Sequence, residues 1–138
     1  MTISVEPWQP ILDRLSQLRD AWPARDWTWD HRFKCATSSL TTEAALTAKS
    51  VLLEAVPTEW DAGAFSRAPE AVRGLAERCG ELRSGQSLLT AEASAGMILF
   101  AMWWPWGDGS KISIRIGVAN SDRSKELYPA IRSMFGIV

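Results

Sequence analysis

The side chains in this sequence that are best suited to covalent chemistry are one histidine, His31, and two cysteines, Cys35 and Cys79. A general base and its thiol nucleophile must approach each other to about 2.6–3.2 Å. His31 and Cys35 lie in a segment of alternating polarity, which is typical of a strand, and residues four apart on a strand are separated by about 13 Å. We therefore predict that these two residues are not a catalytic pair. Nothing in the sequence requires Cys79 to approach His31, and we expect both thiols to be buried.

Acidic residues flank tryptophans at two places, in residues 26–30 and 59–61. A glycosidase uses two carboxylates about 5–9.5 Å apart beside aromatic rings, but Asp26 and Asp30 would lie about 13 Å apart on a strand. We interpret them as solvated charges that border core aromatics. The sequence contains no HExxH, CxxC or GxSxG motif, and "GDGS" precedes an expected strand instead of a helix. We therefore predict no catalytic residue, no metal site and no cofactor, and favour a non-catalytic role without excluding an enzyme.

The stretch "MWWPWGDGSK", residues 102–111, concentrates three tryptophans before a glycine-rich turn. A two-residue loop would place Trp103 opposite Ile114, whereas a three-residue loop would place Trp104 opposite Ile112. We predict the three-residue loop, because it gathers the large side chains of this strand on the same face as the isoleucines of the next one.

This register makes Trp104 a core residue, leaves Trp106 at the rim and turns Trp103 to the other face of the sheet. Arg115 then lies diagonally across from Trp103, within reach of a cation–π contact. If a helix covers that face as well, Trp103 is part of the packing. If no helix covers it, Trp103 and Arg115 form an exposed patch of the kind that anchors protein interfaces.

The elements that position these residues follow from hydrophobic periodicity and from proline and glycine punctuation. Helices are expected over residues 7–23, 38–57 and 68–80, and the tail, residues 121–138, carries a helix that is kinked at, or begins near, Pro129. Strands are expected over residues 26–35, 86–93, 96–104 and 111–118, and residues 58–66 read as a turn. The last three strands are joined by short connections and predict an antiparallel meander. The whole chain, residues 1–138, is expected to form a single compact α+β domain, with a mostly antiparallel sheet of about four strands and helices on one face.

Charge and hydropathy restrict the partners. The chain has 15 basic and 16 acidic residues and a formal charge of -1. No run of like charges could follow a phosphate backbone or an anionic membrane, so we expect neither nucleic acid nor membrane as a partner. The first ten residues lack a signal-peptide pattern, and the longest apolar run, residues 95–106, is shorter than the roughly 20 residues that span a bilayer. We expect a soluble, cytoplasmic protein.

Two hypotheses for the function remain. The first is a non-catalytic protein-binding domain, for example an inhibitor or immunity-type protein that binds and neutralises a partner protein. The second is a small-molecule or carbohydrate-binding domain, with or without enzymatic activity, whose tryptophans stack on the ligand. Both use the same candidate binding residues, which are Trp60, Trp103, Trp106, Asp108 and Arg115. The sequence leaves the oligomeric state open.

Overall fold

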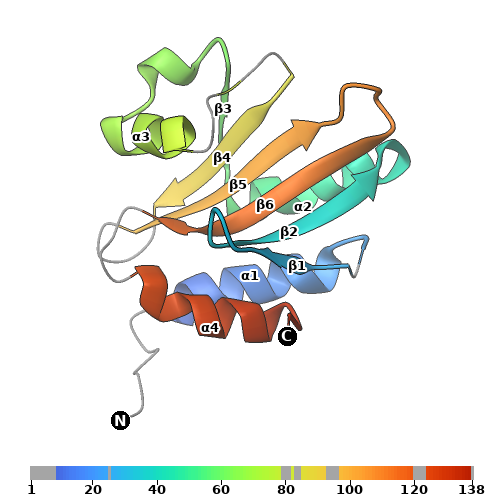
Figure 1. Cartoon of the computed structure of the whole chain (residues 1–138), viewed down its shortest axis with the longest axis vertical. Coiled ribbons are helices and arrows are strands. Elements are labelled where there is room, and N and C mark those ends of the chain that lie inside the picture. Colours follow the sequence, from blue (N-terminus) through green and yellow to red (C-terminus); the bar gives the residue numbers. More distant parts are fainter. Residues whose placement is uncertain are drawn as a thin grey trace.

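The computed structural model describes residues 9–24, 26–78, 82, 85–92, 97–119 and 124–137. Within them the chain forms a six-stranded antiparallel sheet, with strand order β1-β2-β6-β5-β4-β3, and four α-helices (Figure 1). The helices are α1 (Gln9–Ala21), α2 (Ala45–Ala55), α3 (Glu70–Arg78) and α4 (Ser124–Met134). The strands are β1 (Thr28–Asp30), β2 (Cys35–Thr41), β3 (Thr58–Asp61), β4 (Ser87–Glu92), β5 (Ile98–Pro105) and β6 (Lys111–Ala119). The predicted α+β class and the C-terminal meander, β4-β5-β6, are confirmed.

The sheet has two more strands than expected because two segments were misassigned. The single strand predicted over residues 26–35 is a hairpin: β1 pairs with β2, with Asp30 opposite Cys35 and a turn at residues 31–34. Strand β2 then continues to Thr41, through the first residues of the segment that was predicted to be helical, and α2 begins at Ala45 after a short 3-10 turn, Thr42–Ala44. Pairing of β2 with β6 supplies the backbone hydrogen bonds that an earlier helix start would have made locally.

The second misassigned segment is β3, which was predicted to be a turn. It pairs with β4 along the edge of the sheet, with Trp60 opposite Leu88. A strand of four residues with a single large apolar side chain carries almost no periodic signal, so its pairing with β4 decides its structure.

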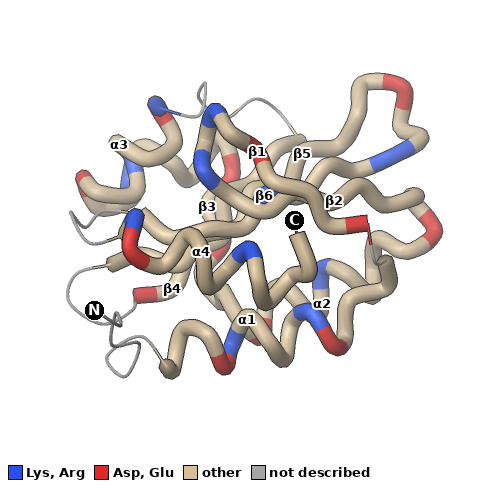
Figure 2. Tube along the Cα trace, turned by 60° about the horizontal axis from the view of Figure 1, so that its bottom comes forward, with Lys and Arg blue, Asp and Glu red and all other residues tan. Residues whose placement is uncertain are grey.

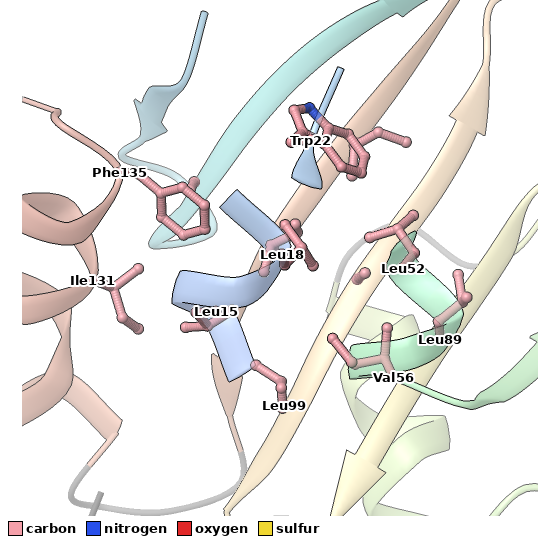
Figure 3. Close-up of a cluster of buried hydrophobic side chains, with 14 of the residues drawn as sticks. Leu15, Leu18, Trp22, Leu52, Val56, Leu89, Leu99, Ile131 and Phe135 are labelled. Atoms are coloured by element: carbon pink, nitrogen blue, oxygen red, sulfur yellow. The ribbon is translucent and has the colours of Figure 1, made fainter. Parts of the chain in front are cut away.

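Helices α1, α2 and α4 cover one face of the sheet and bury a hydrophobic core against it (Figure 3). The labelled members are Leu15, Leu18, Trp22, Leu52, Val56, Leu89, Leu99, Ile131 and Phe135. Helix α3 lies on the opposite face of the sheet (Figure 2). There its Val72 and Leu75 join a second core with Phe100 and Met102. The expectation that the helices share one face therefore holds for three of the four.

The position of α3 also explains why the predicted hairpin register is wrong. Trp103 lies opposite Ile114 and Trp104 opposite Ser113, as in the rejected alternative. The amide of Trp106 donates a hydrogen bond to the Lys111 carbonyl at 2.8 Å, so the loop enclosed by this pair has four residues, 107–110. The predicted register, with Trp104 opposite Ile112, would bury more apolar surface only if one face of β5 were covered. Helices cover both faces.

Two of the predicted helix boundaries have clear physical causes. Helix α1 carries a proline in its first turn, where no amide donor is needed, and Pro23 follows its end. Helix α4 contains Pro129 and still runs on to Met134, with Leu127 and Ile131 buried. Gly136, with φ of 70°, follows that helix in the left-handed conformation typical of a helix C-terminus.

The predicted burial of Cys79 concerns a residue outside the described ranges, as do the first residues of the helix expected over 7–23 and the last residues of the one expected over 68–80. None of the helices within the described part of the chain is long and apolar enough to span a membrane.

Candidate functional site

The tryptophans divide between core and surface. Among those described, Trp22, Trp27 and Trp103 are buried, Trp29, Trp60 and Trp104 are half-buried, and Trp106 is exposed. Most of the tryptophan surplus is therefore used for packing, and the candidate site is built from the few rings that the helices leave accessible.

Trp103, predicted as a recognition residue, is 9% exposed and belongs to the core under α1, α2 and α4. The ammonium group of Lys49 lies 4.7 Å from its ring and is held there by an ion pair with Glu59 at 2.7 Å. Trp103 and Arg115 project from opposite faces of the sheet, so the predicted contact between them is wrong. The register explains the error, because it exchanges the faces of Trp103 and Trp104.

Arg115 lies on the other face of the sheet, at the centre of an aromatic and acidic cluster. Its guanidinium carbon is 4.8 Å from the ring of Trp104 and 5.7 Å from that of Phe33. Its Nε donates a hydrogen bond to Oδ2 of Asp30 at 3.1 Å. Because the cation is stacked on two rings and paired with a carboxylate, its position is fixed before any ligand arrives.

Asp30 organises this cluster through both carboxylate oxygens. Oδ1 accepts hydrogen bonds from the amides of Arg32 and Phe33, each at 2.9 Å, and so holds the β1–β2 turn, while Oδ2 binds Arg115. Partial burial on its own raises the pKa of Asp30, but the bonds from Phe33, Arg115 and Arg32 outweigh it and keep the pKa below 3.8. The carboxylate is therefore charged at neutral pH.

Trp106 and Asp108 lie in the β5–β6 hairpin, at the far end of the same face. Trp106 is 44% exposed; its Nε1 donates to the Ser113 hydroxyl at 2.8 Å, and the Lys111 ammonium lies 5.4 Å from its ring. Asp108 accepts hydrogen bonds from the hydroxyl and the amide of Ser110, which lower its pKa. Both groups of Ser110 are used within the turn, so Asp108 shapes the hairpin that carries Trp106.

The rings and cations of this side of the sheet form one continuous surface. Trp106 contacts Lys111 and Ser113, Ser113 pairs with Trp104, and Arg115 joins Trp104 to Phe33. We call this surface the aromatic face, and its members are Phe33, Trp104, Trp106, Lys111 and Arg115.

Trp60 belongs to the same side of the sheet but to a separate site. In register it shares a row with Arg115, but Leu88 and Met102 lie between them, at three strand spacings or roughly 14 Å. Its Nε1 donates to the Thr90 hydroxyl at 3.1 Å, and its ring lines a cleft of about 720 Å³ beside α3. The five predicted residues are therefore not one site: Trp106, Asp108 and Arg115 share a surface, Trp60 lines a cleft, and Trp103 is in the core.

Sequence reasoning missed three residues of the cluster, Asp30, Phe33 and Trp104. Asp30 carried a usable signal, since an aspartate that precedes a polar run often forms a turn through its own carboxylate. The alternating pattern of polar and apolar residues continues through residues 31–34, so it predicted a strand where Asp30 forms a turn. Trp104 was assigned to the core because its face depends on the hairpin register.

The chemistry that this arrangement offers is recognition by aromatic surface and fixed positive charge. Within the described ranges no group of three or more His, Cys, Asp or Glu side chains is placed to hold a metal ion. His31 is exposed in the β1–β2 turn, whereas Cys35 is buried in the sheet. In comparisons with known proteins, no family model, no curated protein and no solved structure matches this chain.

Proposed function

We propose that this protein binds a protein partner through the aromatic face. The observation that carries the proposal is that α3 lies over the β3-β4 side of its sheet face and leaves the outward side of β6 and β2 without a helix (Figure 1). Around that open side lie the half-buried rings of Trp104, in β5, and Phe33, in the β1–β2 turn, and the exposed ring of Trp106, in the β5–β6 hairpin. Tryptophan and arginine are the residue types that most often dominate the binding energy of protein interfaces. Around them the outward positions of β2 and β6 carry small hydroxyl side chains, Thr37, Ser39 and Ser113, which give a partner a flat surface to pack against.

The partner packs on the face of the sheet and does not extend its edge. The edge strands β1 and β3 have three and four residues, and short edge strands offer few hydrogen-bonding groups to an added strand. Lys111 has no ion-pair partner among the described carboxylates, and Arg32 flanks Phe33 with its guanidinium carbon 4.9 Å from the ring. The partner that fits this surface is a folded protein that presents carboxylates and apolar side chains together. If the chain is an inhibitor or immunity-type protein, its target would carry such a surface.

The proposal is tested with Trp106→Ala, which removes the most exposed ring of the aromatic face. Tagged wild-type protein and the tagged variant are used to capture proteins from the native cells. A protein that is retained by the wild type alone is then purified, and its affinity for the wild type and for the variant is measured by calorimetry. We expect Trp106→Ala to weaken that affinity at least about thirtyfold, as the loss of a dominant interface tryptophan does.

The matched control is Leu46→Ala, which removes another exposed apolar side chain, 87% exposed, from α2 on the helical side of the sheet. We expect it to leave the affinity unchanged. Equal retention of every captured protein by wild type and Trp106→Ala would refute the proposal, and so would an equal loss of affinity in the Leu46→Ala control.

A second candidate function, binding of a small molecule, is favoured by the cleft that Trp60 lines. Its apolar walls come from Val72, Met97 and Ile98, while Arg14 and Glu92 supply charge at the boundary. A volume of about 720 Å³ is within the usual range of ligand sites. A metabolite and glycan screen by thermal shift tests this function: a ligand that stabilises the wild type and not Trp60→Leu supports it, and a screen without any such ligand counts against it.

A further inference from the structure

A second cleft, of about 350 Å³, lies where the β1–β2 turn, the end of α3 and the start of α4 meet. Its polar lining consists of Arg32 and Lys34 from the turn, Arg78 from α3, and Ser124 and Tyr128 from α4. Its apolar lining includes Phe33, Leu75 and Phe100. The cleft therefore combines an apolar wall with a concentration of positive charge, and no acidic side chain of the described residues lines it.

Ser124 is the first residue of α4, a helix of 11 residues, and it lines this cleft. Ser124 is 5% exposed, and its hydroxyl has no hydrogen-bond partner among the described residues. An unsatisfied buried hydroxyl is costly to retain, so a ligand that accepts a hydrogen bond from it would account for its position. The amides of the first turn of a helix also present unpaired donors and a positive dipole end to an anion.

The three cations around the cleft come from two elements that are distant in sequence. None of them forms an ion pair with a described carboxylate: the ion pairs of the described chain involve Arg19, Lys49 and Arg115. Glu126 lies in the first turn of α4 but is not among the residues that line the cleft. Three cations that line one cleft with two hydroxyl side chains match a dianion better than a single negative charge.

Tyr128 adds a second hydroxyl donor one turn after Ser124. Burial raises the pKa of its phenol above 10.0, although the positive charge of Arg78 acts in the opposite direction. The phenol therefore stays protonated at neutral pH and can donate to an anion.

We propose that this cleft binds a small organic phosphate, with the phosphate before the first turn of α4 and the apolar part of the ligand against Phe33, Leu75 and Phe100. Arg78 and Lys34 contact the phosphate from the two sides, and Ser124 and Tyr128 donate hydrogen bonds to its oxygens. The size of the cleft suits a compact ligand. This site is distinct from the proposed partner surface, which it adjoins at Phe33, and does not depend on it.

The test uses phenyl phosphate and inorganic phosphate as probes, titrated into the whole protein at low salt and followed by the amide resonances of Ser124 and Leu127. We expect phenyl phosphate to bind more tightly than inorganic phosphate, because only the former uses the apolar wall. Ser124→Ala and Arg78→Ala should each weaken binding of phenyl phosphate by about tenfold, the effect of losing one hydrogen bond to a charged group.

The matched control is Arg73→Ala, which removes an exposed cation from the same helix as Arg78 but outside the cleft. It should leave the affinity for phenyl phosphate unchanged. Ser124→Ala should also leave the melting temperature unchanged or raise it, because the hydroxyl makes no hydrogen bond within the described part of the chain. A structural role for Ser124 would instead lower it.

Three results would overturn the proposal: no shift of the α4 amides up to millimolar phenyl phosphate, equal affinities for the two probes, or an equal loss of affinity in Arg73→Ala. Partner binding gives an independent readout, since Arg78→Ala should bind the protein partner like the wild type. Failure of one proposal is therefore distinguishable from failure of the other.

Discussion

Trp103 and Trp104 are neighbours in the sequence but lie on faces of the sheet that are built in different ways. The face of Trp103 is closed by three helices, and its tryptophan is packed among aliphatic side chains with Lys49 at the boundary. On the face of Trp104, the ring is stacked with Arg115, whose partner Asp30 also holds the adjacent turn. An aromatic cluster in the sequence therefore does not show which of its rings are buried. The helices that cover each face of the sheet decide this.

The largest effect on stability is expected on β6, where the adjacent residues Ser113 and Ile114 lie on opposite faces of the sheet. Ile114 is completely buried on the helical face, and Ile114→Ala should lower the free energy of unfolding by about 2–5 kcal/mol through loss of burial and formation of a cavity. Ser113→Ala, on the other face, removes only the acceptor for Trp106 and should cost about 1 kcal/mol or less. Urea denaturation of the two variants measures the difference, and similar losses would show that the faces are equally important to stability.

The second prediction concerns the charge that orders the aromatic face. Asp30→Asn keeps an oxygen for the amides of Arg32 and Phe33 but removes the charge opposite Arg115, and should cost about 1–2 kcal/mol at neutral pH. The folded-state pKa of Asp30 is below 3.8, so the carboxylate stabilises the fold above that pH. Its contribution is lost as the pH falls from about 3.8 through the lower folded-state value.

The measurement is the free energy of unfolding of wild type and Asp30→Asn across this acid range. The gap between the two proteins should be largest at neutral pH and close as the pH falls through the folded-state pKa. A gap that stays constant with pH would mean that the charge of Asp30 contributes nothing to the stability of this face.

The same comparison shows how much of the structure the sequence could predict. Helix α1 was predictable because its own apolar residues repeat with the helical period and prolines mark its ends, and the meander because its three strands are consecutive and joined by short connections. The hairpin at Asp30 was not found, since two carboxylate hydrogen bonds override an alternating pattern. The register of Trp103 and Trp104 depends on α3, a distant helix on the second face, and no local pattern encodes that position.

For the candidate site, the sequence identified residues but not their grouping. Trp106 and Arg115 were chosen as interface residue types, and both lie on the aromatic face. Trp60 was included with them, although a row of core side chains separates it from Arg115. Grouping requires strand order, which depends on long-range pairing and is not visible in the spacing of single residues.

The smallest effect on stability is expected at Lys34, in the β1–β2 turn beside the aromatic face. Lys34 is a non-glycine residue of the described chain that has a positive φ, 56°. A side chain in the left-handed region costs roughly 1–2 kcal/mol, whereas glycine has no such penalty but loses more entropy on folding. Lys34→Gly should therefore raise the free energy of unfolding by up to about 1 kcal/mol, and Lys34→Ala, which keeps the strained Cβ, should leave it unchanged.

If the cleft binds phosphate as proposed, both variants should weaken phenyl phosphate binding equally, because both lose the same charge. A gain in stability together with a loss of binding in Lys34→Gly would show that the turn retains a strained lysine for its charge, whereas equal melting temperatures of the glycine and alanine variants would show that the turn stores no strain.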